Sequence, residues 1–238
     1  MTIVLTHARA AALAAFALML AGCTTAADPQ PAPAPSASGV EGLTGEQILA
    51  EARAAVAGAR SYVFEGSRTV GRFKVLGRYR MVNGDTTGTM SMGGRITRFT
   101  ILGEDQYLLP DDGFWEILAE RPGMADAKRE AAGRWVRMST SDVTVERLLG
   151  QQAMITDLDP AGPLVKGKVF GSGGDYWIDM TSGTDPAWRA GVATTGKPYP
   201  THWTTATSQV DLTNFDTEFP EITPPAEDQV VDLRELTA

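Results

Sequence analysis

Hydrophobic and basic residues alternate over most of residues 72–81, with an interruption at Leu76 and Gly77. The apolar members are Phe73, Val75, Tyr79 and Met81, and the basic residues Arg72, Lys74, Arg78 and Arg80 stand between them. A period of two is typical of a strand with one buried and one solvated face. The pattern therefore predicts an antiparallel strand whose four cations face solvent or nearby acidic residues.

Similar signals recur along much of the chain. Asn83-Gly84-Asp85 predicts a tight hairpin turn into a strand that carries Met90 and Met92. Gly171 to Gly174 predicts another hairpin turn, because a strand and not a helix follows it. Further strands are predicted over residues 61–69, 95–102, 106–109, 134–138, 165–170, 176–181 and 203–212.

Helical signals are strongest in two places, and residues 120–133 predict a loop or a short helix. Residues 43–60 place Ile48, Ala52 and Val56 at helical spacing, and Thr44 with Gln47 has the spacing of a capping box. Residues 141–152 predict a second helix. Because helices are grouped and do not alternate with every strand, the order favours an α+β fold over a parallel α/β sheet.

The N-terminus resembles a bacterial lipoprotein leader. Residues 10–21 form an apolar stretch that is shorter than the roughly 20 residues of a membrane-spanning helix and fits a signal peptide. Leu20-Ala21-Gly22 then precedes Cys23, which is the only cysteine of the chain. We expect cleavage after residue 22 and acylation of Cys23, which anchors the protein to the outer face of the cell membrane.

Composition divides the remaining chain into three parts. Residues 23–42 are rich in Pro, Ala, Ser and Thr, and they predict an extended tether after the lipidated cysteine. A folded domain is expected over residues 43–222. Residues 223–238 contain Pro224 and Pro225, followed by a polar stretch, and they predict a loose tail.

Charge and residue types exclude several classes of function. The net charge is −8, and removal of residues 1–22, which hold Arg9 and no acid, makes it one unit more negative. An acidic chain argues against nucleic-acid binding, which needs a basic surface. His202 is the only histidine outside the leader, so the sequence indicates no metal centre, no cofactor and no catalytic set, and we expect a protein that is not an enzyme.

Several segments together resemble actinobacterial lipoproteins of the LppX/LprG type. They are the Leu20–Cys23 lipobox, the Pro-rich spacer, and the segments Leu43–Ala52, Ser61–Gly66, Thr195–Pro200 and Val210–Phe215. The resemblance implies a LolA-like fold, in which a curved antiparallel half-barrel sheet wraps a few helices around an apolar cavity. Some proteins of this type carry lipids or lipoglycans and others have no known ligand, so the resemblance implies a lipid or lipoglycan as a candidate ligand.

The inward side chains of this sheet are the candidate ligand-binding residues. They are Phe73, Val75, Tyr79, Met81, Met90, Met92, Phe99 and Ile101. Methionine suits a cavity that accepts flexible acyl chains. The same alternation also fits a dry core, and the function is then that of an interaction module that contacts an envelope partner such as a sensor kinase or transporter.

Overall fold

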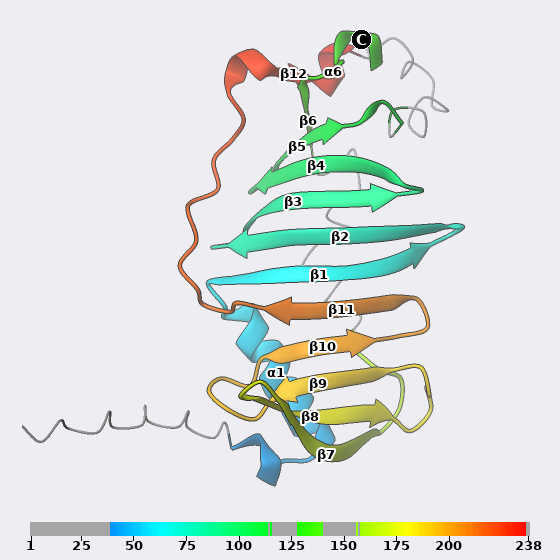
Figure 1. Cartoon of the computed structure of the whole chain (residues 1–238), viewed down its shortest axis with the longest axis vertical. Coiled ribbons are helices and arrows are strands. Elements are labelled where there is room, and N and C mark those ends of the chain that lie inside the picture. The colour runs from blue at the N-terminus through cyan, green and yellow to red at the C-terminus, as the bar shows by residue number, and fades with distance from the viewer. Residues whose placement is uncertain (1–38, 114, 116–127, 140–155, 157, 237–238) are drawn as a thin grey trace, which may run out of the picture. The chain divides into compact units, whose positions relative to one another are not determined.

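A single mixed sheet of twelve strands dominates the described chain (Figure 1). The computed structural model describes residues 39–113, 115, 128–139, 156 and 158–236. Neighbouring strands follow the order β12-β6-β5-β4-β3-β2-β1-β11-β10-β9-β8-β7. Because β12 and β7 both lie at edges, the sheet is open, and the predicted α+β half-barrel class is confirmed.

Most of the strands are joined by short hairpins. Their bounds are β1 Ser61–Val70, β2 Phe73–Val82, β3 Asp85–Met92, β4 Arg95–Leu102, β5 Asp105–Pro110, β6 Trp135–Ser139, β7 Leu164–Ser172, β8 Asp175–Ser182, β9 Arg189–Ala193, β10 Pro200–Thr204, β11 Ser208–Thr213 and β12 Val230–Asp232. Both predicted hairpin turns form. Asn83 and Gly84 have φ of 53° and 94°, and Gly173 and Gly174 have φ of 63° and 96°, which is the geometry that two-residue hairpin turns require.

Helix α1, Gly45–Ala57, covers one end of the sheet. The Thr44 hydroxyl accepts a hydrogen bond from the Gln47 backbone N–H, and the Gln47 side chain accepts one from the Thr44 backbone, so the predicted capping box forms. The helix buries Ile48, Ala52 and Val56 and contacts β7, β9 and β10. Its apolar stripe thus closes the core beneath these strands.

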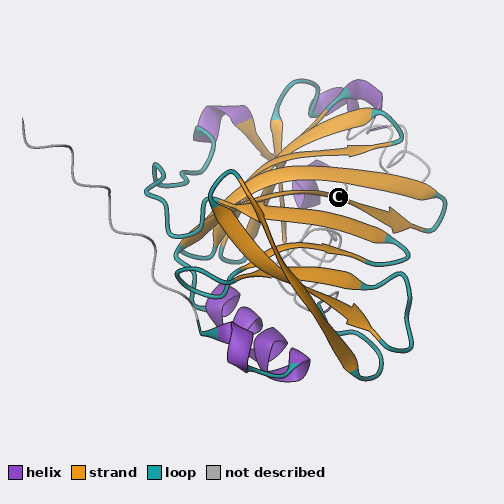
Figure 2. Cartoon of the chain, turned by 60° about the horizontal axis from the view of Figure 1, so that its bottom comes forward, coloured by secondary structure: helices purple, strands orange, loops and turns teal. Residues whose placement is uncertain are grey.

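Close backbone approaches accompany the curvature of the sheet, which Figure 2 shows from one end. Gly88 of β3 lies so near β2 that a Cβ atom would collide with the Arg78 carbonyl oxygen and the Tyr79 Cβ. A Cβ on Gly66 of β1 would lie 2.5 Å from the Gln209 carbonyl oxygen. Glycine at these positions permits the strands to bend toward one another, as glycine kinks do in strongly curved sheets.

The C-terminal segment corrects one prediction. Residues 230–232 are not loose, because they form β12, which pairs in parallel with β6. Arg137 of β6 donates two hydrogen bonds of 3.2 Å to the Asp232 carboxylate, and Arg134 donates one of 2.8 Å to the Val230 carbonyl. A short helix, α6 Leu233–Leu236, follows. These tertiary hydrogen bonds order a segment whose composition alone predicts no ordered structure.

One strand prediction also needs correction, and one further strand was not predicted. The strand predicted over residues 203–212 is divided into β10 and β11, because the Thr205 hydroxyl accepts hydrogen bonds from the N–H groups of Thr207 and Ser208 and closes a turn. Strand β9 was not predicted from the sequence. The predicted helix over residues 141–152 lies outside the described residues.

The folded part starts a little earlier than predicted. A 3-10 turn, η1 Val40–Gly42, precedes α1, and Val40 is buried in the core. A second 3-10 turn, η2 Glu227–Gln229, precedes β12. Residues 1–22 and Cys23 lie outside the described part, and no helix within the described part is long and apolar enough to cross a membrane.

Candidate ligand-binding site

The sheet brings the eight candidate residues onto one face, hereafter the inner face. In register, Met90 lies opposite Thr97, Gly88 opposite Phe99, and Met92 opposite Val75. Phe73 and Met92 are partly buried, and the other six are buried: Val75, Tyr79, Met81, Met90, Phe99 and Ile101. All six belong to the hydrophobic core, and whether they line a cavity stays a prediction.

Aromatic rings fix the geometry at the centre of the inner face. Phe64 of β1 stacks on Tyr79 of β2, with ring centroids 4.4 Å apart, and Tyr79 meets Phe99 of β4 edge to face at 6.0 Å. Burial raises the pKa of the Tyr79 hydroxyl well above its ordinary value. Tyr79 is therefore neutral throughout the physiological range and adds no charge to this apolar surface.

One polar group stands out on the same face. Thr97 of β4 has no solvent exposure, and its side-chain oxygen has no hydrogen-bond partner. A buried unpaired hydroxyl costs about 1–3 kcal/mol, so such groups call for a specific explanation. Thr97 lies opposite Met90, within the candidate surface.

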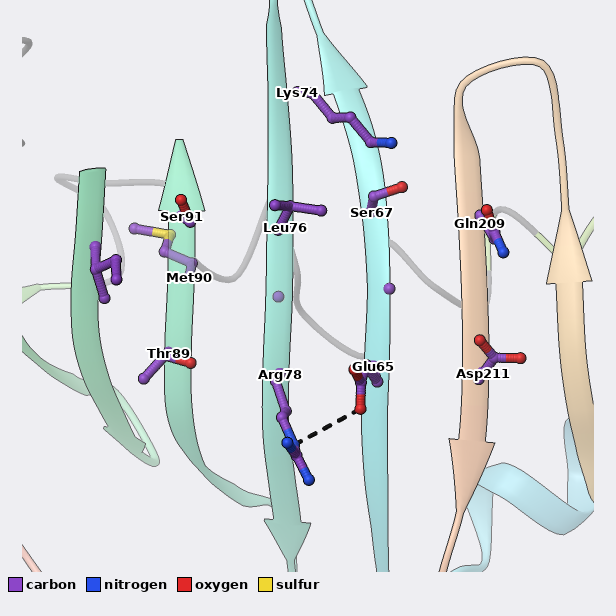
Figure 3. Close-up of a pocket in the computed structure, with 13 residues that line it drawn as sticks. Glu65, Ser67, Lys74, Leu76, Arg78, Thr89, Met90, Ser91, Gln209 and Asp211 are labelled. Carbon is purple, nitrogen blue, oxygen red and sulfur yellow. Dashed lines mark ion pairs between the residues drawn. The ribbon is translucent and has the colours of Figure 1, made fainter. Parts of the chain in front are cut away.

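The outer face of the same strands carries a shallow groove of about 430 Å³ (Figure 3). Leu76 of β2 and Ile96 of β4 line it and are 50% and 54% exposed. Lys74 also lines it, and Arg78 lies 3.6 Å from the Glu65 carboxylate. The cationic row of β2 thus faces outward as predicted, and one of its members has an acidic partner.

A second hollow of about 590 Å³ lies on the outer face of β8, β10 and β11. Trp177 and His202 line one part of it, and Tyr199 and Phe215 line another. The Tyr199 and Phe215 rings stack at 3.9 Å with an interplanar angle of 2°. Trp177 is one of five tryptophans that the sequence offers for sugar stacking or for closing the mouth of a cavity. Tyr199 and Phe215 were not predicted as site residues, because they come from segments separated along the chain.

Asp216 holds the rim of this second hollow together. Its carboxylate accepts hydrogen bonds of 2.6 Å from both Lys197 Nζ and the Tyr199 hydroxyl, and one of 2.9 Å from the Arg60 backbone N–H. The bonds from Lys197, Tyr199 and Arg60, in that order of effect, hold the pKa of Asp216 well below its ordinary value of 3.8. Folding therefore favours the ionised carboxylate.

Replacing this carboxylate gives a pH-dependent loss of stability. We expect Asp216→Asn to lower the free energy of unfolding at pH 7 by about 1 kcal/mol, since one partner is a largely exposed lysine. Because the pKa is lower in the folded state, the contribution of Asp216 is fully present above 3.8 and is lost as the pH falls below that value. Urea unfolding at pH 7 and pH 3 measures the difference.

The matched control is Asp159→Asn. This change removes a 2.7 Å ion pair between Asp159 and Arg53, and the Asp159 side chain is 72% exposed. We expect a change within about 0.5 kcal/mol at both pH values. An equal effect of Asp216→Asn at pH 7 and pH 3 would contradict the assignment of the stabilisation to the ionised form.

No protein-family model and no curated protein sequence matches the chain. Among solved structures, the chain is similar to LprF from Mycobacterium bovis, with a TM-score of 0.47 and 11% identity over 76% of this chain and 97% of LprF. It is also similar to an uncharacterized conserved protein from Thermus thermophilus, with a TM-score of 0.33 and 10% identity over 79% of this chain and 98% of that one. Neither likeness assigns a function, because one fold serves many.

Titratable side chains form no metal site in the described ranges, where no three or more His, Cys, Asp or Glu residues gather. His202 lies 3.8 Å from the Asp179 carboxylate, and its Nδ1 is 3.0 Å from the Thr201 hydroxyl. Among the described residues, neither serine nor cysteine lines the hollow beside this histidine. The described arrangement offers surfaces for binding.

Proposed function

We propose that this protein is an extracytoplasmic lipoprotein, anchored to the cell membrane through acylated Cys23, that binds a lipid or another apolar molecule. The ligand contacts the inner face of strands β2, β3 and β4. The protein holds or passes on this ligand without chemical change and uses no cofactor. The tether begins at Cys23 and ends before the 3-10 turn at Val40, and it keeps the domain away from the membrane surface while allowing it to move.

One observation carries the proposal, which is the composition of the inner face in an open sheet. Six buried apolar side chains from three adjacent strands point to one side, and two of them are methionines. Methionine adapts its shape to flexible hydrocarbon. The unpaired Thr97 hydroxyl lies among them and gives a polar group of a ligand one hydrogen-bonding partner.

Met90→Trp tests this proposal directly. Met90 is 3% exposed, so a larger ring at this position occupies space on the inner face that we assign to the ligand. We expect lipid bound to the purified full-length protein to fall at least about fivefold, while the melting temperature of the lipid-free protein changes little. In a tightly packed core, the same change is overpacking and costs about 1–3 kcal/mol.

Leu76→Trp is the matched control, because Leu76 lies on the adjacent strand but on the outer face and is 50% exposed. Its bound lipid should equal that of the wild type. A large loss of thermal stability in Met90→Trp, together with unchanged lipid content, would remove the inner-face site.

A ligand-free interaction module is the second candidate function. The exposed Leu76 and Ile96 favour it, because they place apolar surface beside Lys74 on the outer face. An envelope protein such as a sensor kinase or transporter is the partner in this alternative. Loss of partner binding in Leu76→Asp, with no lipid found in the wild type, would favour this function over lipid binding.

A further inference from the structure

The hollow on the outer face of β8, β10 and β11 is built differently from the inner face. We propose that it binds a neutral sugar ring, independently of any lipid. Its volume of about 590 Å³ lies within the range of small-molecule sites. Partly exposed aromatic side chains line it together with side-chain oxygens and amides, which is a mixture that the apolar inner face lacks.

Trp177 supplies a fixed aromatic surface. Its indole N–H donates a 3.0 Å hydrogen bond to Asp179, and its ring meets His202 edge to face at 6.0 Å and 87°. The side chain is nevertheless only partly buried. A sugar presents C–H groups on the faces of its ring, and an amphipathic aromatic side chain that is already oriented can pack against them at little entropic cost.

Three polar side chains in the hollow have no partner within the described part of the chain. They are Asp175, Asp211 and Asn214, and each lines the hollow without a hydrogen bond or ion pair from its side chain. Carboxylates accept hydrogen bonds only, and an amide both donates and accepts. Hydroxyl groups around a sugar ring satisfy both kinds of side chain, so these groups can orient such a ligand.

The available charges decide the class of sugar. Lys197 also lines the hollow, but its ammonium group lies 2.6 Å from the Asp216 carboxylate and is neutralised there. The charges left for a ligand are the carboxylates of Asp175 and Asp211, which repel anions. Uronic acids, sulfated sugars and phosphates are therefore disfavoured, and a neutral ring is accepted.

The rim of the hollow is held rigidly before any ligand binds. Asn214 and Asp216 have φ of 56° and 53°, in the left-handed region that Asn and Asp adopt more readily than other non-glycine residues. The bonds from Lys197, Tyr199 and the Arg60 backbone hold the Asp216 carboxylate in place. A site that does not have to order itself spends less free energy on binding.

The test uses the full-length protein in a detergent without a sugar headgroup, because alkyl maltosides would compete. Cellotetraose, maltotetraose and tetra-N-acetylchitotetraose are the neutral probes, and tetragalacturonate is the anionic counterpart. Binding is followed by tryptophan fluorescence and by saturation-transfer NMR. We expect at least one neutral probe to bind saturably with a Kd of about 1 mM or tighter, and tetragalacturonate to bind at least about tenfold more weakly.

Two variants locate the binding. Trp177→Ala and Asp211→Asn should each raise the Kd of the neutral probe by about tenfold. Asp112→Asn changes an exposed aspartate after β5 and should leave the Kd unchanged. If Trp177→Ala does not fold, Asp211→Asn still tests the sugar site, because the asparagine preserves the shape of the exposed Asp211 side chain.

The proposal is overturned if none of the neutral probes binds saturably, if tetragalacturonate binds equally well, or if Asp211→Asn binds like the wild type. Lipid content is measured on the same samples. The two sites lie on opposite faces of the sheet. A loss of sugar binding with unchanged lipid content therefore does not contradict the inner-face lipid site, and a loss of lipid with unchanged sugar binding does not contradict the sugar site.

Discussion

Trp203→Ala should destabilise the protein by about 3–5 kcal/mol, which is the usual cost of truncating a buried tryptophan. Trp203 of β10 has no solvent exposure and is among the largest fully buried side chains. It pairs in register with Ala190 of β9 and Val210 of β11, and α1 packs against β9 and β10. These small and medium neighbours cannot fill the space that the indole vacates.

A loss of this size is a large fraction of the 5–15 kcal/mol that stabilises a typical domain, so the melting temperature should fall by roughly 10 °C. Trp203→Phe is the matched control. It keeps an aromatic ring and removes a buried indole N–H that has no partner, so we expect a loss of only about 1 kcal/mol. Equal losses of stability in the two variants would show that the packing around the ring does not account for the stabilisation by Trp203.

Gly88→Ala should destabilise the protein by about 3 kcal/mol, because one methyl group meets atoms that cannot move away. The nearest atoms are the Arg78 carbonyl oxygen, the Tyr79 Cα and the Tyr79 Cβ, all on the neighbouring strand. Relief requires β2 and β3 to separate or the sheet to flatten. Chemical denaturation measures the loss, and far-ultraviolet circular dichroism checks that the fold persists.

Gly42→Ala provides the comparison for Gly88→Ala. A Cβ at Gly42 meets nothing within 4 Å, and the residue does not have a positive φ, so alanine should change the free energy of unfolding by less than about 0.5 kcal/mol. If both glycine variants behave alike, the close approach of β2 and β3 is not a determinant of the curved sheet.

The local features of the fold were readable from the sequence because each depends on neighbouring residues. The alternation around Tyr79 gave β2, the Asn83-Gly84 pair gave its hairpin, and Thr44 with Gln47 gave the start of α1. The inner face followed from the same alternation, since a period of two assigns every side chain to one side or the other.

Features that depend on distant partners were missed. Val230–Asp232 joins the sheet through the side chains of Arg134 and Arg137, almost a hundred residues earlier. The outer hollow combines Trp177, Tyr199 and Phe215, whose segments meet only through strand pairing. Neither a hydropathy pattern nor a turn signal encodes such contacts, and the composition of the tail suggested the opposite.

Other protein atoms cover the buried side chains of the inner face, so a ligand that contacts these side chains has to displace those atoms. Lipid carriage is the central claim, and extraction of the purified full-length protein followed by mass spectrometry tests it most directly. We predict one apolar ligand per protein molecule, in addition to the acyl groups bound covalently at Cys23. An extract from correctly folded wild-type protein that contains no stoichiometric apolar ligand, and a failure to take up added lipid, would contradict the claim.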